Sequence, residues 1–228
     1  MASVPVPREL VARDPRLVAP DLLGRVLRHG HRSGRIVEVE AYCGAEDPAA
    51  HTYRGRTARN ATMFGPPGLL YVYRSYGLHW CANIVCGAAG QGVAVLIRAL
   101  RPLAGLDDMR MAATAARRTT APPVPDRDLC RGPGRLCRAL GIDGSHDGTD
   151  LLAENDGMAL EDDGWRPAEI GQGPRVGITA AADRPWRWWV GGATEVSRGP
   201  RRELSRGAGA DGLGSPLPGK TPGNSFPS

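Results

Sequence analysis

The sequence predicts an α+β fold, with a curved mixed or antiparallel sheet and packed helices in a single compact domain. Three observations support this class: apolar and polar residues alternate over 35–42, an apolar run fills 92–100, and residues 105–118 have a helical pattern. A chain of 228 residues can bury the core of one such domain. We expect residues 1–198 to form it.

Further elements follow in chain order. The segment 8–30 is expected to hold one or two short helices. In 35–42, "RIVEVEAY", Val37, Val39 and Ala41 share one strand face, whereas Glu38, Glu40 and Tyr42 share the other. Further strands are expected as a hairpin in 68–86 with its turn near 74–77, as a strand buried on both faces in 92–100, and at 174–180 ("PRVGITA") and 186–190 ("WRWWV"). The sheet should contain about six to eight strands.

Two helices and a tail are expected in the second half. Residues 105–118 begin with aspartates and end with arginines, which suits a helix dipole. A short helix should begin near residue 134, after Gly-Pro-Gly. Twelve of the thirty residues in 199–228 are Gly or Pro, so a disordered tail is predicted there.

Composition limits the class of protein. No apolar run is long enough for a signal peptide or a membrane span, so a soluble, cytoplasmic protein without a membrane partner is expected. We also expect it to be a monomer. The five cysteines form no C-x-x-C pair, which argues against a disulfide framework and a zinc finger. We expect them to be reduced and buried.

Positive charge is concentrated in one block. Residues 98–138 hold nine arginines and four aspartates, a surplus of five that equals the net charge of the whole chain, +5. Such a block suggests a polyanionic partner, although a solvated surface explains it equally well.

The glutamates of 35–42 are the first candidates for chemistry. Glu38 and Glu40 are two positions apart on one strand face, about 6.5 to 7 Å between Cα atoms. This spacing is compatible with the pairs of catalytic carboxylates that glycosidases use. The alternative is an exposed polar face, which antiparallel sheets often have. Arg98 interrupts an apolar run, and a buried arginine needs an anionic partner, for which Glu40 is a candidate.

Aromatic side chains gather in "YVYRSYGLHW", residues 71–80. Tyr71 and Trp80 are expected in the core. Tyr76 lies at the predicted turn between Arg74 and Gly77, where little core is available, so it is a candidate wedge for a stack of nucleic-acid bases. A metal site from His51, Glu46, Asp47 and His79 is the competing hypothesis, but no ligand spacing supports it.

The ordered motifs resemble the alkyladenine (3-methyladenine) DNA glycosylase family. The resemblance rests on 35–86, which begins "RIVEVEAYCGAEDPAAHTYRGRTARN", and on "VLIRAL", "RGPGRLCRALGI" and "RVGIT", and it extends over about 21–190. It implies a DNA glycosylase of base excision repair that flips alkylated or deaminated purines out of double-stranded DNA and hydrolyses the N-glycosidic bond, leaving an abasic site. The implied fold is a compact α/β domain on a curved antiparallel sheet, and neither cofactor nor metal is expected.

The resemblance also implies roles for single residues. Glu40 matches the general base, and Arg98 matches a partner that helps to place the water. The positions that match base-binding residues are Tyr42, His51, Tyr73 and Asn83, and those that match DNA contacts are the wedge Tyr76 and the loop residues Arg59 and Met63. Arg101 and Arg131 depart from the family pattern, because relatives have neutral or acidic residues there.

Two further expectations follow. The only lysine is Lys220, in the predicted tail, so the enzyme should lack an amine nucleophile and be monofunctional. The competing functions are a nucleic-acid-binding module without activity, against which Glu40 beside aromatic residues argues, and a metallohydrolase.

Overall fold

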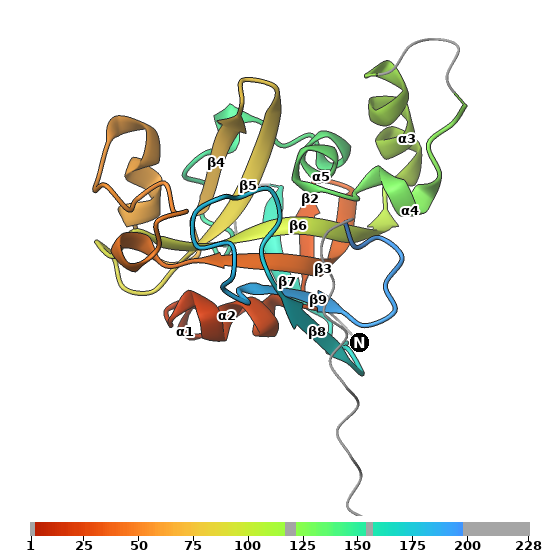
Figure 1. Cartoon of the computed structure of the whole chain (residues 1–228). Coiled ribbons are helices and arrows are strands. Elements are labelled where there is room, and N and C mark those ends of the chain that lie inside the picture. The colour runs from red at the N-terminus through yellow and green to blue at the C-terminus, as the bar shows by residue number, and fades with distance from the viewer. Residues whose placement is uncertain (1–2, 117–121, 154–156, 198–228) are drawn as a thin grey trace, which may run out of the picture.

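One antiparallel sheet organises the part of the chain that the computed structural model describes, residues 3–116, 122–153 and 157–197 (Figure 1). Nine strands are present in these residues, and their order is β1-β7-β2-β3-β6-β5-β4, with β9 added to β3 and β8 added to β9. Every strand pair is antiparallel. The predicted α+β class is therefore confirmed.

The strands are β1 (Val4–Pro5), β2 (Val26–His29), β3 (Arg32–Tyr42), β4 (Leu70–Ser75), β5 (His79–Cys86), β6 (Val93–Ala104), β7 (Met158–Asp162), β8 (Ile170–Gly173) and β9 (Arg187–Val190). The central strands and the hairpin agree with the sequence prediction. The strand predicted at 174–180 is wrong, because β8 ends at Gly173 and the chain then bends. The N–H of Val176 donates to the Glu40 side chain instead of to a neighbouring strand.

Helices cover both sides of the sheet. They are α1 (Arg8–Val11), α2 (Pro15–Leu22), α3 (Leu106–Ala115), α4 (Asp126–Leu129) and α5 (Pro133–Leu140), with 3-10 helices η1 (Gly44–Glu46), η2 (Ala58–Phe64) and η3 (Gly144–His146). Figure 1 shows α1 and α2 on one side of β3 and β6, and α3 to α5 on the other. None of the described helices is both long enough and apolar enough to cross a bilayer.

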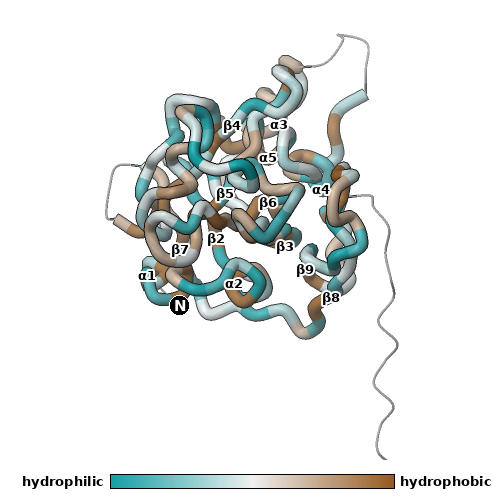
Figure 2. Tube along the Cα trace, turned by 60° about the vertical axis from the view of Figure 1, so that its left-hand side comes forward, coloured by the Kyte–Doolittle hydropathy of each residue, from teal (hydrophilic) through white to brown (hydrophobic). Residues whose placement is uncertain are grey.

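The main core lies between the sheet and the helices. Val37, Val39 and Ala41 are fully buried in it, as the alternation in β3 predicts. In Figure 2 apolar segments lie along the central strands, and many of the surrounding loops are hydrophilic. A second, small cluster consists of Met63, Tyr71, Val85 and Ala94. The predicted tail, 199–228, lies outside the described residues.

Three register shifts interrupt the β3–β6 ladder, one between Ser33 and Gly34 and two beside Glu38. Glu38 pairs with Ala99 and Val39 pairs with Ile97, which leaves Arg98 as an extra residue in β6. The other shift beside Glu38, between Ile36 and Glu38, belongs to β3. A bulge re-aims the side chain of the extra residue. The bulge in β6 is the site at which Arg98 reaches the glutamates of β3.

Candidate active site

Glu40 is fixed in the middle of the sheet and is fully buried. Its backbone pairs with Leu96 of β6 on one side and with Arg187 of β9 on the other. The Oε1 atom accepts the N–H of Val176 at 2.7 Å, and Oε2 accepts the Tyr42 hydroxyl at 3.0 Å. Burial raises the pKa of Glu40, while Arg98, the Val176 N–H and the Tyr42 hydroxyl oppose that rise. The carboxylate is thus a stronger base than that of an ordinary glutamate.

Arg98 is shared by the two glutamates of β3. Its Nε lies 3.0 Å from Glu38 Oε1, and its Nη1 lies 3.2 Å from Glu40 Oε1. Glu38 also accepts Arg187 Nε at 2.7 Å and the Ser197 N–H at 2.6 Å. Burial alone would lower the pKa of Arg98, but Glu40 and Glu38 raise it, so the guanidinium stays charged. The predicted contact with Glu40 is confirmed. The alternative of an exposed polar face is wrong, because both glutamates are fully buried.

Three aromatic rings stand together beside this network. The ring centroids of His51 and Tyr73 are 4.4 Å apart with their planes at 83°, and Tyr73 stacks on Tyr71 at 5.6 Å. The His51 Nδ1 lies 3.2 Å from the Tyr71 hydroxyl. Desolvation and the nearby Arg59 lower the pKa of His51, so its imidazole is neutral at neutral pH.

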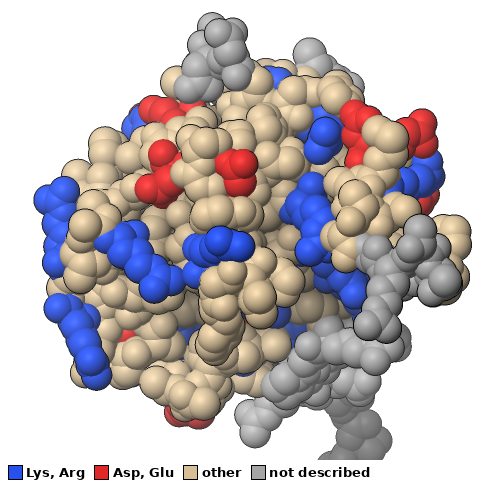
Figure 3. Space-filling model, turned by 90° about the horizontal axis from the view of Figure 1, so that it is seen from above, with Lys and Arg blue, Asp and Glu red and all other residues tan. Residues whose placement is uncertain are grey.

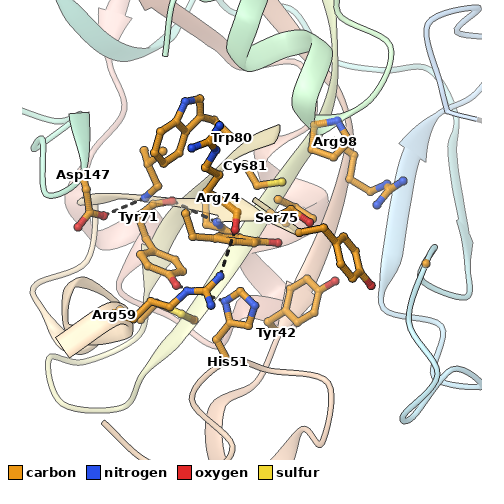
Figure 4. Close-up of a pocket in the computed structure, with 18 of the residues that line it drawn as sticks. Tyr42, His51, Arg59, Tyr71, Arg74, Ser75, Trp80, Cys81, Arg98 and Asp147 are labelled. Carbon is orange, nitrogen blue, oxygen red and sulfur yellow. Dashed lines mark hydrogen bonds between the residues drawn. The ribbon is translucent and has the colours of Figure 1, made fainter. Parts of the chain in front are cut away.

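These rings line a cavity of about 990 Å³ (Figure 4). All of the predicted site residues contribute to its walls except Glu40, which lies directly behind three lining residues, Tyr42, Arg98 and Val176. Sequence reasoning did not assign several other lining residues: Tyr71 and Trp80, expected in the core, and Arg74, Cys81, Asp147 and Ile178. Their spacing in the sequence gives no sign that they line a cavity. The exception is "RVGIT", a segment of the family resemblance, which supplies Val176 and Ile178.

Tyr76 occupies the tip of the β4–β5 hairpin. Its φ is +48°, and Gly77 follows with φ +69°, so the two residues have the left-handed conformations of a tight hairpin turn. The side chain of Tyr76 is 92% exposed, and Leu78 beside it is 71% exposed. The expectation that Tyr76 has little core to bury in is confirmed. Leu78 is a second exposed apolar side chain at this tip.

The segment η2 supports one wall of the cavity. Arg59 is exposed, and its Nη2 donates to the Arg74 carbonyl oxygen at 3.1 Å. Met63 is only 3% exposed and packs in the small cluster beneath the cavity. Met63 also lines the cavity, and its role as a DNA contact stays a prediction. Asp147 joins η2 to β4, because it accepts from Thr62 Oγ1 and from a β4 backbone N–H.

Asn83 stands on β5 and is 5% exposed. Its Nδ2 donates to the Tyr71 carbonyl oxygen at 3.1 Å, and its backbone pairs with Leu96 of β6. This hydrogen bond fixes the orientation of the amide within the cavity wall. A purine edge that reached the wall would therefore meet an oriented amide rather than a freely rotating one.

Much of the basic block at 98–138 is paired within the protein. Arg98 binds Glu38 and Glu40, Arg101 binds Glu195, Arg110 binds Asp107 and Asp126, and Arg131 binds Asp128. At the cavity, the exposed arginines are Arg59 and Arg74. Figure 3 views the molecule from above, the direction in which the β4–β5 hairpin projects, and basic side chains are spread across the middle of that face.

The competing metal hypothesis has little geometric support. Asp47, one of its four candidate ligands, binds Arg175 through both carboxylate oxygens. Within residues 3–116, 122–153 and 157–197, no three His, Cys, Asp or Glu side chains are grouped closely enough to hold an ion. All five cysteines are buried and none forms a disulfide, as expected.

Comparison with known proteins gives a consistent result. The family model for methylpurine-DNA glycosylase matches residues 9–194, which include Glu40 and every residue that lines the cavity. A protein of Burkholderia cenocepacia is 58% identical over 194 residues, which is 84% of this chain and 90% of that protein. Relatives in Rhodopseudomonas palustris and Koribacter versatilis are 51% and 46% identical, cover 85% of this chain each, and are covered over 90% and 93% of their own lengths. All three carry the name of 3-methyladenine DNA glycosylases.

Proposed function

The chain belongs to the methylpurine-DNA glycosylase family, and from this premise we propose that it removes alkylated and deaminated purines from double-stranded DNA by flipping them into the cavity. Water then hydrolyses the N-glycosidic bond, and an abasic site remains. The observation that carries this proposal is a buried glutamate, Glu40, held by Arg98 directly behind an aromatic cavity. We propose that the protein acts as a monomer.

The aromatic walls supply the energy for flipping. Extruding a nucleotide costs a few kcal/mol, and stacking a base on an aromatic side chain is worth about 1 to 3 kcal/mol. Tyr42, with Tyr73 or His51, can therefore offset the cost. A base alkylated at N3 or N7 is cationic, and the faces of tyrosine rings attract cations. Selectivity for alkylated purines follows in part from this attraction.

Glu40 serves as the general base in this proposal. Its carboxylate takes a proton from a water at the cavity wall, the water oxygen bonds to C1′, and the electron pair of the N-glycosidic bond leaves with the purine. The negative charge also stabilises the oxocarbenium-like transition state. Arg98 holds the carboxylate ionised and oriented. Glu38 does not take part in the reaction, because its oxygens are occupied by Arg98, Arg187 and Ser197.

The proposed wedge lies at the tip of the hairpin. Among the large apolar side chains of the described residues, that of Tyr76 is the most exposed, and it lines the outer part of the cavity. Insertion of this ring into the space that the flipped base has left would slow the return of the base.

Glu40→Gln tests the proposal. Glutamine keeps the size and hydrogen bonding of the side chain but removes the base, so excision should fall by at least about 10²- to 10⁴-fold, while lesion binding largely survives. The measurement is single-turnover excision from duplexes that each carry one 3-methyladenine, 7-methylguanine, hypoxanthine or ethenoadenine. Glu161→Gln, on β7 and paired with Arg28, is the matched control. Near-normal excision by Glu40→Gln would refute the assignment.

The same reactions test whether water is the nucleophile. An intact strand should persist until hot alkali is added, and borohydride should trap no covalent adduct, because the only lysine is Lys220. Cleavage without alkali in a nuclease-free preparation would show an amine mechanism. A protein that binds lesions but excises none would be a binding module.

A further inference from the structure

We propose that Arg175 is a positioning residue whose ion pair with Asp47 fixes the Tyr42 ring and the Val176 N–H against Glu40. This inference rests on the proposed function, in which Glu40 is the base and Tyr42 is a stacking surface. Neither Arg175 nor Asp47 lines the cavity. Their role would be to hold the residues that do.

The pair itself is buried and bidentate. Arg175 Nη1 lies 2.5 Å from Asp47 Oδ2, Nη2 donates to Oδ1 at 2.8 Å, and both side chains are fully buried. Nη1 also donates to the Ala41 carbonyl oxygen on β3 at 3.0 Å. Asp47 accepts the N–H groups of Cys43 and Ala49 as well. The pair therefore joins three segments: β3, the loop that follows it toward His51, and the bend after β8.

Tyr42 is held through its ring by this pair. The guanidinium carbon of Arg175 lies 4.7 Å from the Tyr42 ring centroid, a cation–π distance, and 5.1 Å from the Trp186 ring centroid. The Tyr42 hydroxyl is fixed separately on Glu40. Ring and hydroxyl are both restrained, so Tyr42 offers a flipped base a surface that is already in place. Preorganisation of this kind lowers the cost of binding.

Glu40 is held through the neighbour of Arg175. Val176 follows directly in the chain, and its N–H donates to Glu40 Oε1. The bend that carries Val176 has no strand partner, so it is anchored to β3 by the buried pair at residue 175 and by the hydrogen bond from Val176 to Glu40. Loss of the pair should loosen two of the hydrogen bonds that Glu40 accepts, from Val176 and from Tyr42.

The effect on proton transfer has a defined sign. The charged and titratable groups facing Glu40 are Arg98 from β6, Glu38 and Tyr42 from β3, Tyr73 from β4, and Arg175 from the bend after β8. The Val176 and Tyr42 hydrogen bonds favour the ionised carboxylate. Weakening them disfavours ionisation, so the acidic limb of the excision rate should move to higher pH.

The chain contains a close structural control. Arg35 also forms a bidentate pair, with Asp163 at 2.9 and 2.6 Å, donates to the Gly24 carbonyl oxygen, and lies 4.8 Å from the Trp165 ring centroid, although Asp163 is partly exposed. Neither Arg35 nor Asp163 contacts the cavity or Glu40. Each variant removes one bidentate arginine–aspartate pair, but only the Arg175–Asp47 pair supports the site.

The experiment compares R175M/D47N with R35M/D163N. Each double variant removes both charges, so no lone buried charge remains. Single-turnover excision of hypoxanthine is measured against pH and corrected for the folded fraction from thermal melts. In R175M/D47N the plateau rate should fall by about 10- to 100-fold, because a displacement of catalytic groups by about 1 Å reduces a rate by up to about that much. The acidic limb of the pH–rate profile should also move to higher pH. R35M/D163N should show neither change.

Arg175→Lys tests the positioning role of Arg175 if the double variant does not fold. Lysine keeps a positive charge opposite Asp47 but loses the bidentate hydrogen bonds and the planar contact with Tyr42. The acidic limb of the pH–rate profile should therefore again move to higher pH. A wild-type limb and plateau in a folded Arg175 variant would overturn the proposal. The proposed function fails on a different result, namely unimpaired excision by Glu40→Gln or no excision by the wild type.

Discussion

At the scale of single residues, the site depends on how the guanidinium of Arg98 interacts with two carboxylates, those of Glu38 and Glu40. Glu38 is bound by two arginines and Ser197, and it holds Arg98 through Nε. Glu40 receives only Nη1 of Arg98, at 3.2 Å. Because Glu40 does not have the guanidinium to itself, burial remains the largest influence on its pKa. Two glutamates two positions apart thereby acquire different environments, one a structural anchor and the other a proposed base.

The raised pKa of Glu40 makes the excision rate pH-dependent. The proposed base must be ionised, so the rate should be maximal above its pKa and should fall as the pH decreases through it, at a higher pH than for an ordinary glutamate. Single-turnover excision of hypoxanthine across the acidic range would show this limb. His51 titrates in acid as well, and its pKa is lowered. The limb should therefore persist in His51→Gln, and a flat profile would contradict the role of Glu40.

At the scale of elements, the β4–β5 hairpin combines a firm base with an exposed tip. Its strands pair over six positions, from Leu70 with Ile84 to Ser75 with His79, and η2 is tied to it through Arg59 and Asp147. The tip projects beyond these supports (Figure 1). A wedge needs this combination, because a ring that enters a base stack must resist being pushed back.

Tyr76→Ala tests the wedge. A side chain that is 92% exposed contributes little to the folded state, so the melting temperature of the free protein should barely change, while lesion binding and excision should weaken. Thermal melts with and without lesion DNA measure both effects. Tyr53→Ala, which removes another exposed tyrosine outside the cavity, is the control. A large loss of stability in free Tyr76→Ala would place the ring in the core and exclude the wedge.

At the scale of the whole molecule, the charge that the sequence concentrates at 98–138 is redistributed by folding. Four of its arginines form ion pairs, whereas Arg59 and Arg74 from another part of the chain are exposed at the cavity. The DNA-binding surface that we propose is therefore not one stretch of sequence. It consists of the side chains that the hairpin and η2 bring to the mouth of the cavity.

The salt dependence of DNA binding checks this surface. Each phosphate contact that is lost should reduce the slope of log affinity against log salt by about one. Arg59→Ala and Arg74→Ala should each lower the slope, whereas Arg110→Ala, whose guanidinium is paired with Asp107 and Asp126, should leave it unchanged. Titration of a lesion duplex at several salt concentrations measures the slopes. If only Arg110→Ala changed the slope, the DNA-binding surface would lie on the 98–138 block instead.

Truncation separates the tail from the domain. Removal of the residues after Arg198 should leave excision nearly unchanged, because that segment is too polar and too rich in Gly and Pro to form a core. Removal of two residues more deletes Ser197, which donates to both oxygens of Glu38, and should reduce stability and excision together. Melts and excision assays of the two truncated chains make the comparison. Loss of activity in the longer chain would make the tail part of the site.

The local pattern of the sequence determined the strand faces and the exposed tip of the hairpin. Alternation in β3 separates Val37 and Val39 from Glu38 and Glu40, and the hairpin turn exposes Tyr76. Such features depend on neighbours in the chain, since a strand repeats every two residues and a turn spans four. The family resemblance then assigned roles to these positions.

Only the tertiary structure decided how the site is held together. A bulge in β6 aims Arg98, Val176 reaches Glu40 across 136 positions, and Arg175 reaches Asp47 across 128. It also buried Met63 in the cavity wall and ended β8 before the segment predicted as a strand. Contacts between residues so far apart leave no period or spacing in the sequence, because they depend on which buried groups fold against one another and must satisfy each other's charge and hydrogen bonds.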